Sequence, residues 1–430
     1  QTINNLERPV NIDEMNEMFT NLDDSNFSEL IEICRRLIYK LDSSDLNDRN
    51  SLINWKNKYM DILTNKYSTH LYSISIDSVS SIPKVLPIYS DEEKFVDGRI
   101  IIRDNFDKLL ENNSKIFIFG EDVGKIGDVN QGLEGLQKKH GKNRVFDTSI
   151  RESTIVGQGI GMSMRGLRPI AEIQYLDYIL YALQILSDDL GTLTYRTHGG
   201  QKAPLIVRTR GHRLEGIWHS GSPLGGMISF LRGVFILTPR NMTKAAGFYN
   251  TLLDIDQPAV VIEPLNGYRT KEQLPSNYGQ FKTPIGEIEI LKEGTDITLV
   301  SYGSTFNIVI NVAEEIEKYG ISCEVIDVQS LIPFDIKKEI SKSVIKTNRL
   351  LIIDEDLPGG CSSYILQELL EKQDIYKYLD SKPSLLTAKD HRPPYGSDGD
   401  YASKPSFEDI FEKIYLIMRE SDPEKYKELF

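Results

Sequence analysis

Short, almost continuously apolar segments recur along this chain, and stretches with helical periodicity separate them. Continuous apolar strands that alternate with helices are typical of a parallel sheet covered on both faces. The sequence therefore predicts an α/β fold with two parallel-sheet domains in tandem. The predicted strands begin at Ile116, Arg144, Pro169, Pro204, Val234 and Ala259, and then at Ile297, Cys323, Arg349 and Ser384.

The flanking composition predicts the domain boundaries. Residues 1–95 are expected to form a helical N-terminal segment that ends in an extended linker, because apolar residues recur at helical spacing up to about residue 70. Residues 96–270 form the first predicted domain, and the polar residues 271–284, which contain Pro and Gly, form a linker. Residues 285–430 form the second predicted domain.

Charge and composition exclude several classes of protein. A net charge of −13 argues against nucleic acid as a partner, since such binding needs a basic face. Apolar runs stay well below the ~18 residues of a membrane span. The three scattered cysteines fit a reducing compartment and give no metal-binding pattern. No targeting segment is evident, so we expect a cytoplasmic protein without a membrane partner.

The segment 144–178 carries the principal candidate for chemistry. A short strand leads to Ser149, then to Glu152, and then to an apolar helical run. Two interpretations are open. Ser149 and Glu152 have the spacing of a helix capping box, in which the glutamate only satisfies a backbone donor. Alternatively, Glu152 is a catalytic carboxylate.

The motifs around Glu152 resemble those of a known family. The matching segments are Gly120–Val123, Arg144–Thr148, Arg168–Tyr175, Tyr195–Arg196, His219–Ser220, Ala245–Gly247 and Ile262–Pro264. In this order and spacing they resemble the β subunit of the thiamine-diphosphate-dependent 2-oxoacid dehydrogenases, over roughly residues 101–418. The resemblance implies a pyrimidine-binding domain followed by a transketolase-type C-terminal domain, and it implies thiamine diphosphate as the cofactor.

The resemblance also implies roles for individual residues. Glu152 would share a proton with the pyrimidine ring of the cofactor, which requires an apolar setting that raises a carboxyl pKa. Gln174 and Tyr178 would line the same ring, with Tyr178 as its aromatic surface. Ile150 would complete the apolar surroundings of Glu152.

The loop that follows residue 210 carries the candidates for substrate contact. His219 matches the histidine of a His-Ser-Gln pattern in the family, which implies that it contacts the substrate or intermediate. Gly221 stands where that pattern has Gln, so this chain departs from the family at that position. His212 is a weaker candidate on the same loop. Arg208 and Arg210 are candidates for binding the substrate carboxylate.

Two other glycine-containing patterns do not match the binding motifs that they resemble. Gly157, Gly159 and Gly161 do not fit a dinucleotide-binding fingerprint, because Met162 occupies the position of the last glycine, so close packing of the helix is expected. The family's diphosphate motif, Gly-Asp-Gly followed by Asn, is not found; the nearest text, Gly396–Asp400, has no later Asn. No metal ligands are therefore predicted on this chain.

The missing diphosphate motif predicts that a second chain or segment completes the cofactor site. We expect an α subunit, or an α portion of the same fused chain, to hold Mg²⁺ and the diphosphate. The chain would then be the carboxy-terminal part of a longer protein. The resemblance further implies a lipoyl acyltransferase as a partner and pairing of two β portions in a heterotetramer.

These features predict the decarboxylating component of a 2-oxoacid dehydrogenase complex. It would decarboxylate a branched-chain oxoacid or pyruvate and transfer the acyl group to a lipoyl group, with a slight preference for branched-chain substrates from Gln174 and Tyr178. One alternative is an enzyme similar to transketolase or to the synthase of deoxyxylulose phosphate. Another is a non-catalytic subunit that only assembles the complex.

Overall fold

The structure is a computed structural model that describes residues 27–40, 46–73, 78–211, 222–392, 394 and 396–429. By its internal contacts the chain forms two compact units, residues 1–69 and residues 70–430. Within the described ranges, no helix combines the length and the apolar character needed to cross a membrane.

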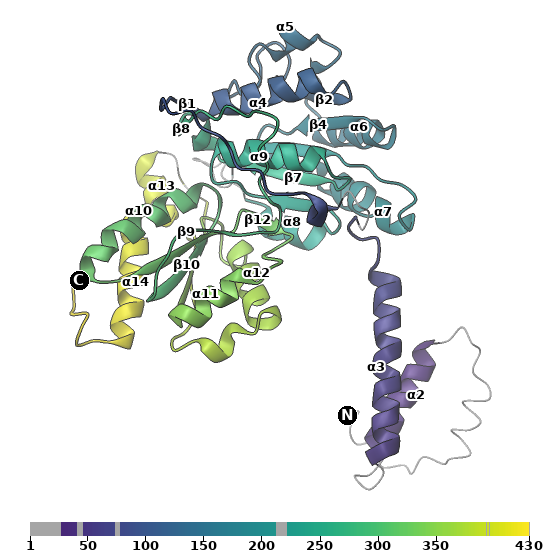
Figure 1. The fold of residues 1–430 in the computed structure, drawn as a ribbon, viewed down its shortest axis with the longest axis vertical. Coiled ribbons are helices and arrows are strands. Elements are labelled where there is room, and N and C mark those ends of the chain that lie inside the picture. Colours follow the sequence, from purple (N-terminus) through teal and green to yellow (C-terminus); the bar gives the residue numbers. More distant parts are fainter. Residues whose placement is uncertain are drawn as a thin grey trace. The chain divides into compact units, whose positions relative to one another are not determined.

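The first unit is a pair of packed helices, α2 (Phe27–Lys40) and α3 (Leu46–Ser68) (Figure 1). The buried side of α2 carries Ile33, Cys34 and Ile38. The thiol of Cys34 lies 3.6 Å from the carbonyl oxygen of Leu52 on α3. The helical N-terminal segment predicted from the sequence is thus confirmed for the part that is described.

A seven-stranded sheet forms the first half of the second unit, in the order β12-β6-β7-β5-β4-β2-β3. Its strands are β2 (Ile116–Gly120), β3 (Val145–Asp147), β4 (Arg168–Glu172), β5 (Ile206–Arg210), β6 (Phe235–Leu237), β7 (Ala259–Glu263) and β12 (Ser330–Ile332). All neighbouring strands run parallel except β12, which is antiparallel to β6. The second half of the chain therefore supplies one edge strand of the first sheet.

Helices cover both faces of this sheet because successive strand residues point to opposite sides. Ile170 packs into the core formed with α4 (Gly98–Asn112) and α9 (Met242–Leu253). Its neighbour Ala171 packs into the opposite core, with α6 (Glu152–Met164) and α8 (Leu224–Phe230).

A second sheet has five strands in the order β14-β13-β10-β11-β9 (Figure 1). Its strands are β9 (Glu289–Lys292), β10 (Ile297–Ser301), β11 (Cys323–Asp327), β13 (Leu350–Ile353) and β14 (Ser384–Leu386). Only β9 is antiparallel to its neighbour. One face packs on α10 (Phe306–Ile316) and α14 (Phe407–Ser421), and the other shares a core with the first sheet.

The remaining α-helices and strands are short. They are β1 (Phe95–Asp97), β8 (Lys271–Gln273), α5 (Leu136–His140), α7 (Leu193–Arg196), α11 (Glu339–Thr347), α12 (Cys361–Gln367) and α13 (Ser397–Ser403). The predicted fold class, two parallel-sheet α/β domains after a helical segment, is confirmed, and all ten predicted strands are present. The predicted boundaries at residues 96, 271 and 285 remain a proposal.

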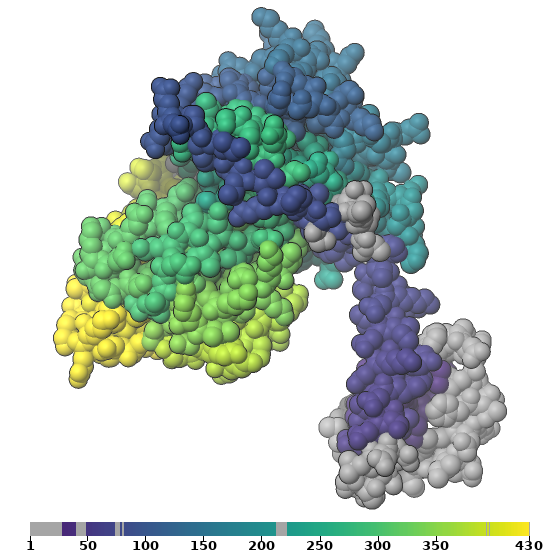
Figure 2. All heavy atoms as spheres, viewed as in Figure 1, coloured from purple at the N-terminus to yellow at the C-terminus, as the bar shows by residue number. Residues whose placement is uncertain are grey.

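The two segments predicted as linkers lie side by side. Residues 85–97 pair antiparallel with residues 271–282, through β1 with β8 and through two isolated bridges. Asn277 supports this pairing, since its side-chain oxygen accepts from the Ile88 amide at 2.9 Å and its side-chain nitrogen donates to the Leu86 carbonyl at 3.0 Å. Figure 2 shows the earlier segment on the surface in dark blue.

A partly buried ion cluster joins the two sheets. Arg240, which follows β6, lies 2.7 Å from Asp327 of β11 and 2.6 Å from Glu289 of β9. Lys244 of α9 lies 2.8 Å from the same Glu289 oxygen. Burial raises the pKa of Asp327 to about 6, although Arg240 acts in the opposite direction.

This cluster predicts a pH dependence of stability. The folded protein binds the Asp327 proton more tightly than the unfolded chain, so the stabilisation is complete below pH 3.8 and is lost as the pH rises through about 6. We expect Asp327→Asn to remove this component. Between pH 4 and 6 the free energy of unfolding of the native protein, measured in urea, should fall relative to that of the variant by up to about 1.4 kcal/mol per pH unit. Parallel stability curves for the two proteins would contradict the assignment.

Candidate active site

Three strand ends bring the sequence candidates to one edge of the first sheet. Gly120, at the end of β2, is in register with Asp147 of β3 on one side and with Glu172 of β4 on the other. The chain leaves β2 toward β3 and later returns to the other side of β2 as β4. Ligands of parallel α/β sheets bind outside the carboxyl ends of the strands at such a switch in strand order.

Glu152 is the first residue of α6, and Arg151 is its N-cap. No side chain makes a capping hydrogen bond there, so the capping-box interpretation of Ser149 and Glu152 is wrong. The carboxylate is half-buried, with Ile155 and Val156 buried behind it. Ile150 is 62% exposed, so it does not provide the expected enclosure within this chain.

A second carboxylate, Glu121, lies beside Glu152. It follows β2 directly, and the pKa of its carboxyl group is raised by burial and then by the negative charges of Asp122 and Glu152. A carboxyl group with a raised pKa exchanges protons nearer to neutral pH than an exposed one. Glu121 was not among the residues predicted from the sequence, although two consecutive acidic residues at the end of an apolar strand were a visible signal.

Gln174 and Tyr178 join the same cluster. The side-chain amide of Gln174 donates to a carboxylate oxygen of Asp122 at 3.1 Å. Tyr178 lies on the 3₁₀ helix Leu176–Ala182, and its ring meets that of Tyr175 edge-on at 5.8 Å. The Tyr178 pKa is raised mainly by burial, with contributions from Asp177, Tyr175, Glu121 and Glu152. The structure thus brings Glu152, Gln174 and Tyr178 together.

The backbone after β2 is shaped to present these groups. Asp122 has a left-handed backbone conformation with φ of +58°. The amide of Gly124 donates to Asp147 at 2.7 Å, and a Cβ at Gly124 would lie 2.5 Å from the other Asp147 carboxylate oxygen. A larger residue at Gly124 would have to displace the side chain of Asp147, whose hydrogen bond to the Gly124 amide holds the loop that carries Glu121 and Asp122.

Arg208 and Arg210 lie in a buried ion network and not on an open surface. Neither has exposed surface. Arg208 lies 2.8 Å from Glu263 and 2.9 Å from Asp128, and it also contacts Glu172. Arg210 lies 2.9 Å from Glu172 and 3.1 Å from Asp128.

The burial of these arginines argues against the predicted contact with a substrate carboxylate. Such a carboxylate would have to displace an internal one, and removing one partner from a buried pair is costly. Burial raises the pKa of Glu172. The guanidinium groups of Arg210 and Arg208 act in the opposite direction. Arg210 also donates to the backbone oxygen of Gln174 at 3.0 Å. The network therefore supports the turn that carries Gln174.

His212 and His219, the other two candidates for substrate contact, lie in residues 212–221, outside the described part of the chain. The described residues include no group of three or more His, Cys, Asp or Glu side chains arranged to hold a metal ion.

The glycines of α6 differ in their surroundings. A Cβ at Gly159 would lie 2.6 Å from Leu205, so this glycine allows close packing of the helix on the sheet. Gly157 and Gly161 have no described atom within 4 Å of such a Cβ. The packing interpretation is thus confirmed for Gly159, whereas the other two glycines lie on the exposed face of α6.

This difference gives a matched pair of substitutions. We expect Gly159→Ala to destabilise the chain by about 1–3 kcal/mol, because the new methyl group overpacks against Leu205. Gly161→Ala should be neutral or stabilise by up to about 1 kcal/mol, since alanine favours the helix. Urea unfolding of both variants measures this difference, and equal effects would contradict the packing.

Comparison with known proteins agrees with this geometry. Residues 96–271 match the pyrimidine-binding domain of transketolase, and residues 286–404 match the transketolase C-terminal domain. The chain is 32% identical over 292 residues to the pyruvate dehydrogenase E1 component subunit beta of Acholeplasma laidlawii, covering 67% of this chain and 88% of that protein. The chain belongs to the family of 2-oxoacid dehydrogenase E1 β subunits.

Other members of this family are similar over most of their length. The 2-oxoisovalerate dehydrogenase subunit beta of Bacillus subtilis is 32% identical over 253 residues, which cover 58% of this chain and 76% of that protein. A solved structure described as a split-gene transketolase, an inactive β4 tetramer, aligns with a TM-score of 0.59 at 18% identity. It covers 75% of this chain and 97% of its own, and it supports the fold alone. The family is thiamine-diphosphate-dependent.

Proposed function

We propose that this chain is the β portion of the decarboxylating E1 component of a 2-oxoacid dehydrogenase and carries the pyrimidine half of a thiamine-diphosphate site. The observation that supports this most strongly is the cluster of Glu152, Glu121, Gln174 and Tyr178 at the switch point of the first sheet. The names of its relatives include both pyruvate and 2-oxoisovalerate dehydrogenases. We therefore propose a branched-chain oxoacid or pyruvate as the substrate.

The residues of the cluster fit the cofactor. A basic heteroaromatic ring needs a carboxyl group that holds a proton at a ring nitrogen, and half-buried Glu152 can supply it. The ring of Tyr178 offers an aromatic surface, and such contacts are worth about 0.5–1.5 kcal/mol beyond burial. When bound, thiamine diphosphate would supply a carbon nucleophile for chemistry at the oxo group of the substrate.

The remaining residues of the cluster act on Glu152 and its surroundings. Burial, followed by the negative charges of Asp122 and Glu152, raises the pKa of Glu121, so this neighbouring carboxyl group takes up a proton more readily than an exposed one. Gln174 holds Asp122 and so fixes the loop after β2. Ile150, two residues before Glu152, is exposed, so a partner that covers it would bury an apolar side chain next to Glu152 and help to exclude water.

The proposal includes partners that complete the site. An α subunit, or an α portion of a longer chain, would hold Mg²⁺ and the diphosphate, since Mg²⁺ is usually bound by few protein oxygens together with phosphate. A lipoyl acyltransferase would receive the acyl group, and a second β portion would complete a heterotetramer. We propose the cytoplasm as the site of action. His219 and His212 remain proposed substrate contacts.

A substrate panel tests the proposed function. The chain, expressed together with its α partner, is assayed for CO₂ release from pyruvate and branched-chain oxoacids with a lipoylated acceptor. We expect acceptor-dependent release with at least one oxoacid. Ketol transfer between sugar phosphates without oxoacid decarboxylation would favour the transketolase-like alternative. Activity that requires the chain but is unchanged when Glu152 and Glu121 are replaced would favour a non-catalytic assembly role.

A further inference from the structure

A polar groove lies at the switch point of the second sheet. Strand β10 has β11 on one side and β13 on the other, and the chain passes from β10 through α10 to β11 before it crosses to β13. The carboxyl ends of β10 and β13 therefore flank a crevice of the kind that binds ligands in α/β sheets. A groove of about 680 Å³ lies there, which is the size of typical small-molecule sites.

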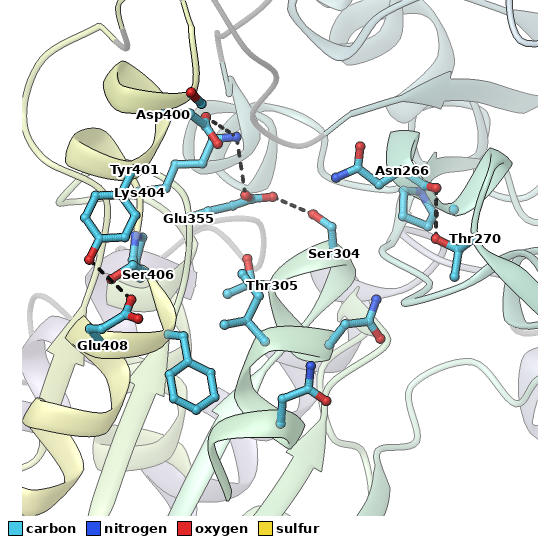
Figure 3. A pocket seen from close by; sticks show the side chains of 18 residues that line it. Asn266, Thr270, Ser304, Thr305, Glu355, Asp400, Tyr401, Lys404, Ser406 and Glu408 are labelled. Atoms are coloured by element: carbon cyan, nitrogen blue, oxygen red, sulfur yellow. Dashed lines mark hydrogen bonds and ion pairs between the residues drawn. The ribbon is translucent and has the colours of Figure 1, made fainter. Parts of the chain in front are cut away.

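Residues from both sheets line this groove (Figure 3). Ser304 and Thr305 follow β10, Glu355 follows β13, and Asp400 and Lys404 come from the segment around α13. On the opposite side, Asn266 follows β7 of the first sheet. The groove is separate from the cluster around Glu152, and none of the residues proposed to bind the thiamine ring lines it.

One side chain of the groove is polar, buried and without a partner. Thr305 is 2% exposed, and its hydroxyl group has no hydrogen-bond partner among the described residues. A buried hydroxyl without a partner costs free energy, which a bound ligand would recover. Figure 3 shows Thr305 facing the groove below Ser304 and Glu355.

The charges of the groove select the ligand. Three carboxylates line it, Glu355, Asp400 and Glu408, against the single ammonium group of Lys404 among the described lining residues. Lys404 is already engaged, at 2.7 Å from Asp400 and 4.0 Å from Glu355. The excess of negative charge disfavours an anion and favours a cation.

The start of α10 does not reverse this preference. A helix N-terminus attracts negative charge, but the hydroxyl of Ser304 donates to the carboxylate of Glu355 at 2.7 Å. Glu355 therefore already provides the negative group at this helix end. The uncharged lining groups, including Thr305, Asn266 and Ser406, can donate and accept hydrogen bonds from hydroxyl groups.

We propose that this groove binds a small hydroxylated amine, with the ammonium group at Glu355 and Asp400 and a hydroxyl group at Thr305. This inference is independent of the thiamine chemistry. A compound of this class bound here would contact both sheets and would stabilise their present arrangement by mass action.

Two sugars that differ in one group test the proposal. Titration calorimetry of the full chain compares D-glucosamine with D-glucose, which lacks the ammonium group. We expect glucosamine to bind at least about tenfold more tightly, as a favourable charged contact allows. Glu355→Gln should lower the affinity for glucosamine and leave that for glucose unchanged, because the amide keeps an acceptor for Ser304 but removes one of the two charges at the ammonium group.

Thr305→Val tests the buried hydroxyl, and we expect it to weaken glucosamine binding by about tenfold. Thr238→Val is its matched control, because Thr238 is equally buried, also lacks a hydroxyl partner among the described residues, and lies outside the groove. Should Thr305→Val fail to fold, Asp400→Asn on the half-exposed rim tests the same groove through its charge, and we expect it to weaken the binding of glucosamine but not of glucose.

Several outcomes would overturn the proposal. In the first two, the chain binds no glucosamine, or it binds both sugars with equal affinity. In the other two, it binds inorganic phosphate more tightly than glucosamine, or it loses the same affinity for glucosamine in Thr305→Val as in Thr238→Val. Glu152→Gln should leave glucosamine binding unchanged, so that failure here and failure of the proposed function are separate results.

Discussion

Replacing Glu152 by Gln in the assembled enzyme is expected to lower the rate of 2-oxoacid decarboxylation by about 10²- to 10⁴-fold. Glutamine has nearly the same shape as glutamate but cannot hold and release the proton at the pyrimidine ring. The N-cap of α6 is Arg151 and not Glu152, so the substitution leaves the N-cap residue of this helix in place. The measurement is steady-state CO₂ release, with a thermal melt to show that the variant is folded.

Glu339→Gln is the matched control for this experiment. Glu339 is the first residue of α11, just as Glu152 is the first residue of α6, so both substitutions remove a favourable charge from a helix start. We expect Glu339→Gln to retain full activity. Unchanged turnover in Glu152→Gln, or an equal loss in both variants, would contradict a catalytic role and would favour the non-catalytic assembly subunit.

Replacing Arg208 by Met is expected to have the largest effect on stability, a loss of about 3–5 kcal/mol in the free energy of unfolding. The substitution leaves the carboxylates of Asp128, Glu172 and Glu263 buried with less compensation. The phenolic groups of Tyr249 and Tyr268 belong to the same network through Glu263. Urea unfolding gives the free energy, and the loss is a large part of the total stability of a typical domain.

Arg419→Met provides the comparison for Arg208→Met. Arg419 is a partly exposed arginine that lies 3.3 Å from Glu428, and exposed ion pairs contribute about 0–1 kcal/mol. Similar small losses in both variants would show that the buried network is not held by its charges. In that case the support that Arg210 gives to Gln174 would also need another explanation.

The sheets could be predicted from the sequence because their strands are apolar on both faces. Val145 to Asp147 and Ile297 to Ser301 were visible as isolated runs between helical segments. The edge strands β9 and β12 were not predicted. Each has only three or four residues, and β12 pairs with β6, which lies about 90 residues earlier in the chain, so the pairing arises from tertiary contact.

The candidate site residues could be named from the resemblance to the family, whereas the contacts that strand register creates could not be read from the sequence. Glu152, Gln174 and Tyr178 follow strand ends, and parallel strands bring such ends together. Arg208 looked available because the sequence does not show which residues lie beside it. In the sheet, Glu172 is its direct neighbour on β4, and Glu263 lies opposite Arg210 on β7, so internal carboxylates neutralise both arginines.

The most direct test of the proton held by Glu152 is the rate at which the thiazolium proton of bound thiamine diphosphate exchanges with deuterium. The assembled native enzyme and the Glu152→Gln variant are saturated with cofactor, quenched in acid at short times and read by proton NMR. We predict exchange about 10²- to 10⁴-fold slower in the variant, with cofactor still bound. Equal exchange rates in the two proteins would contradict the proposed role of Glu152.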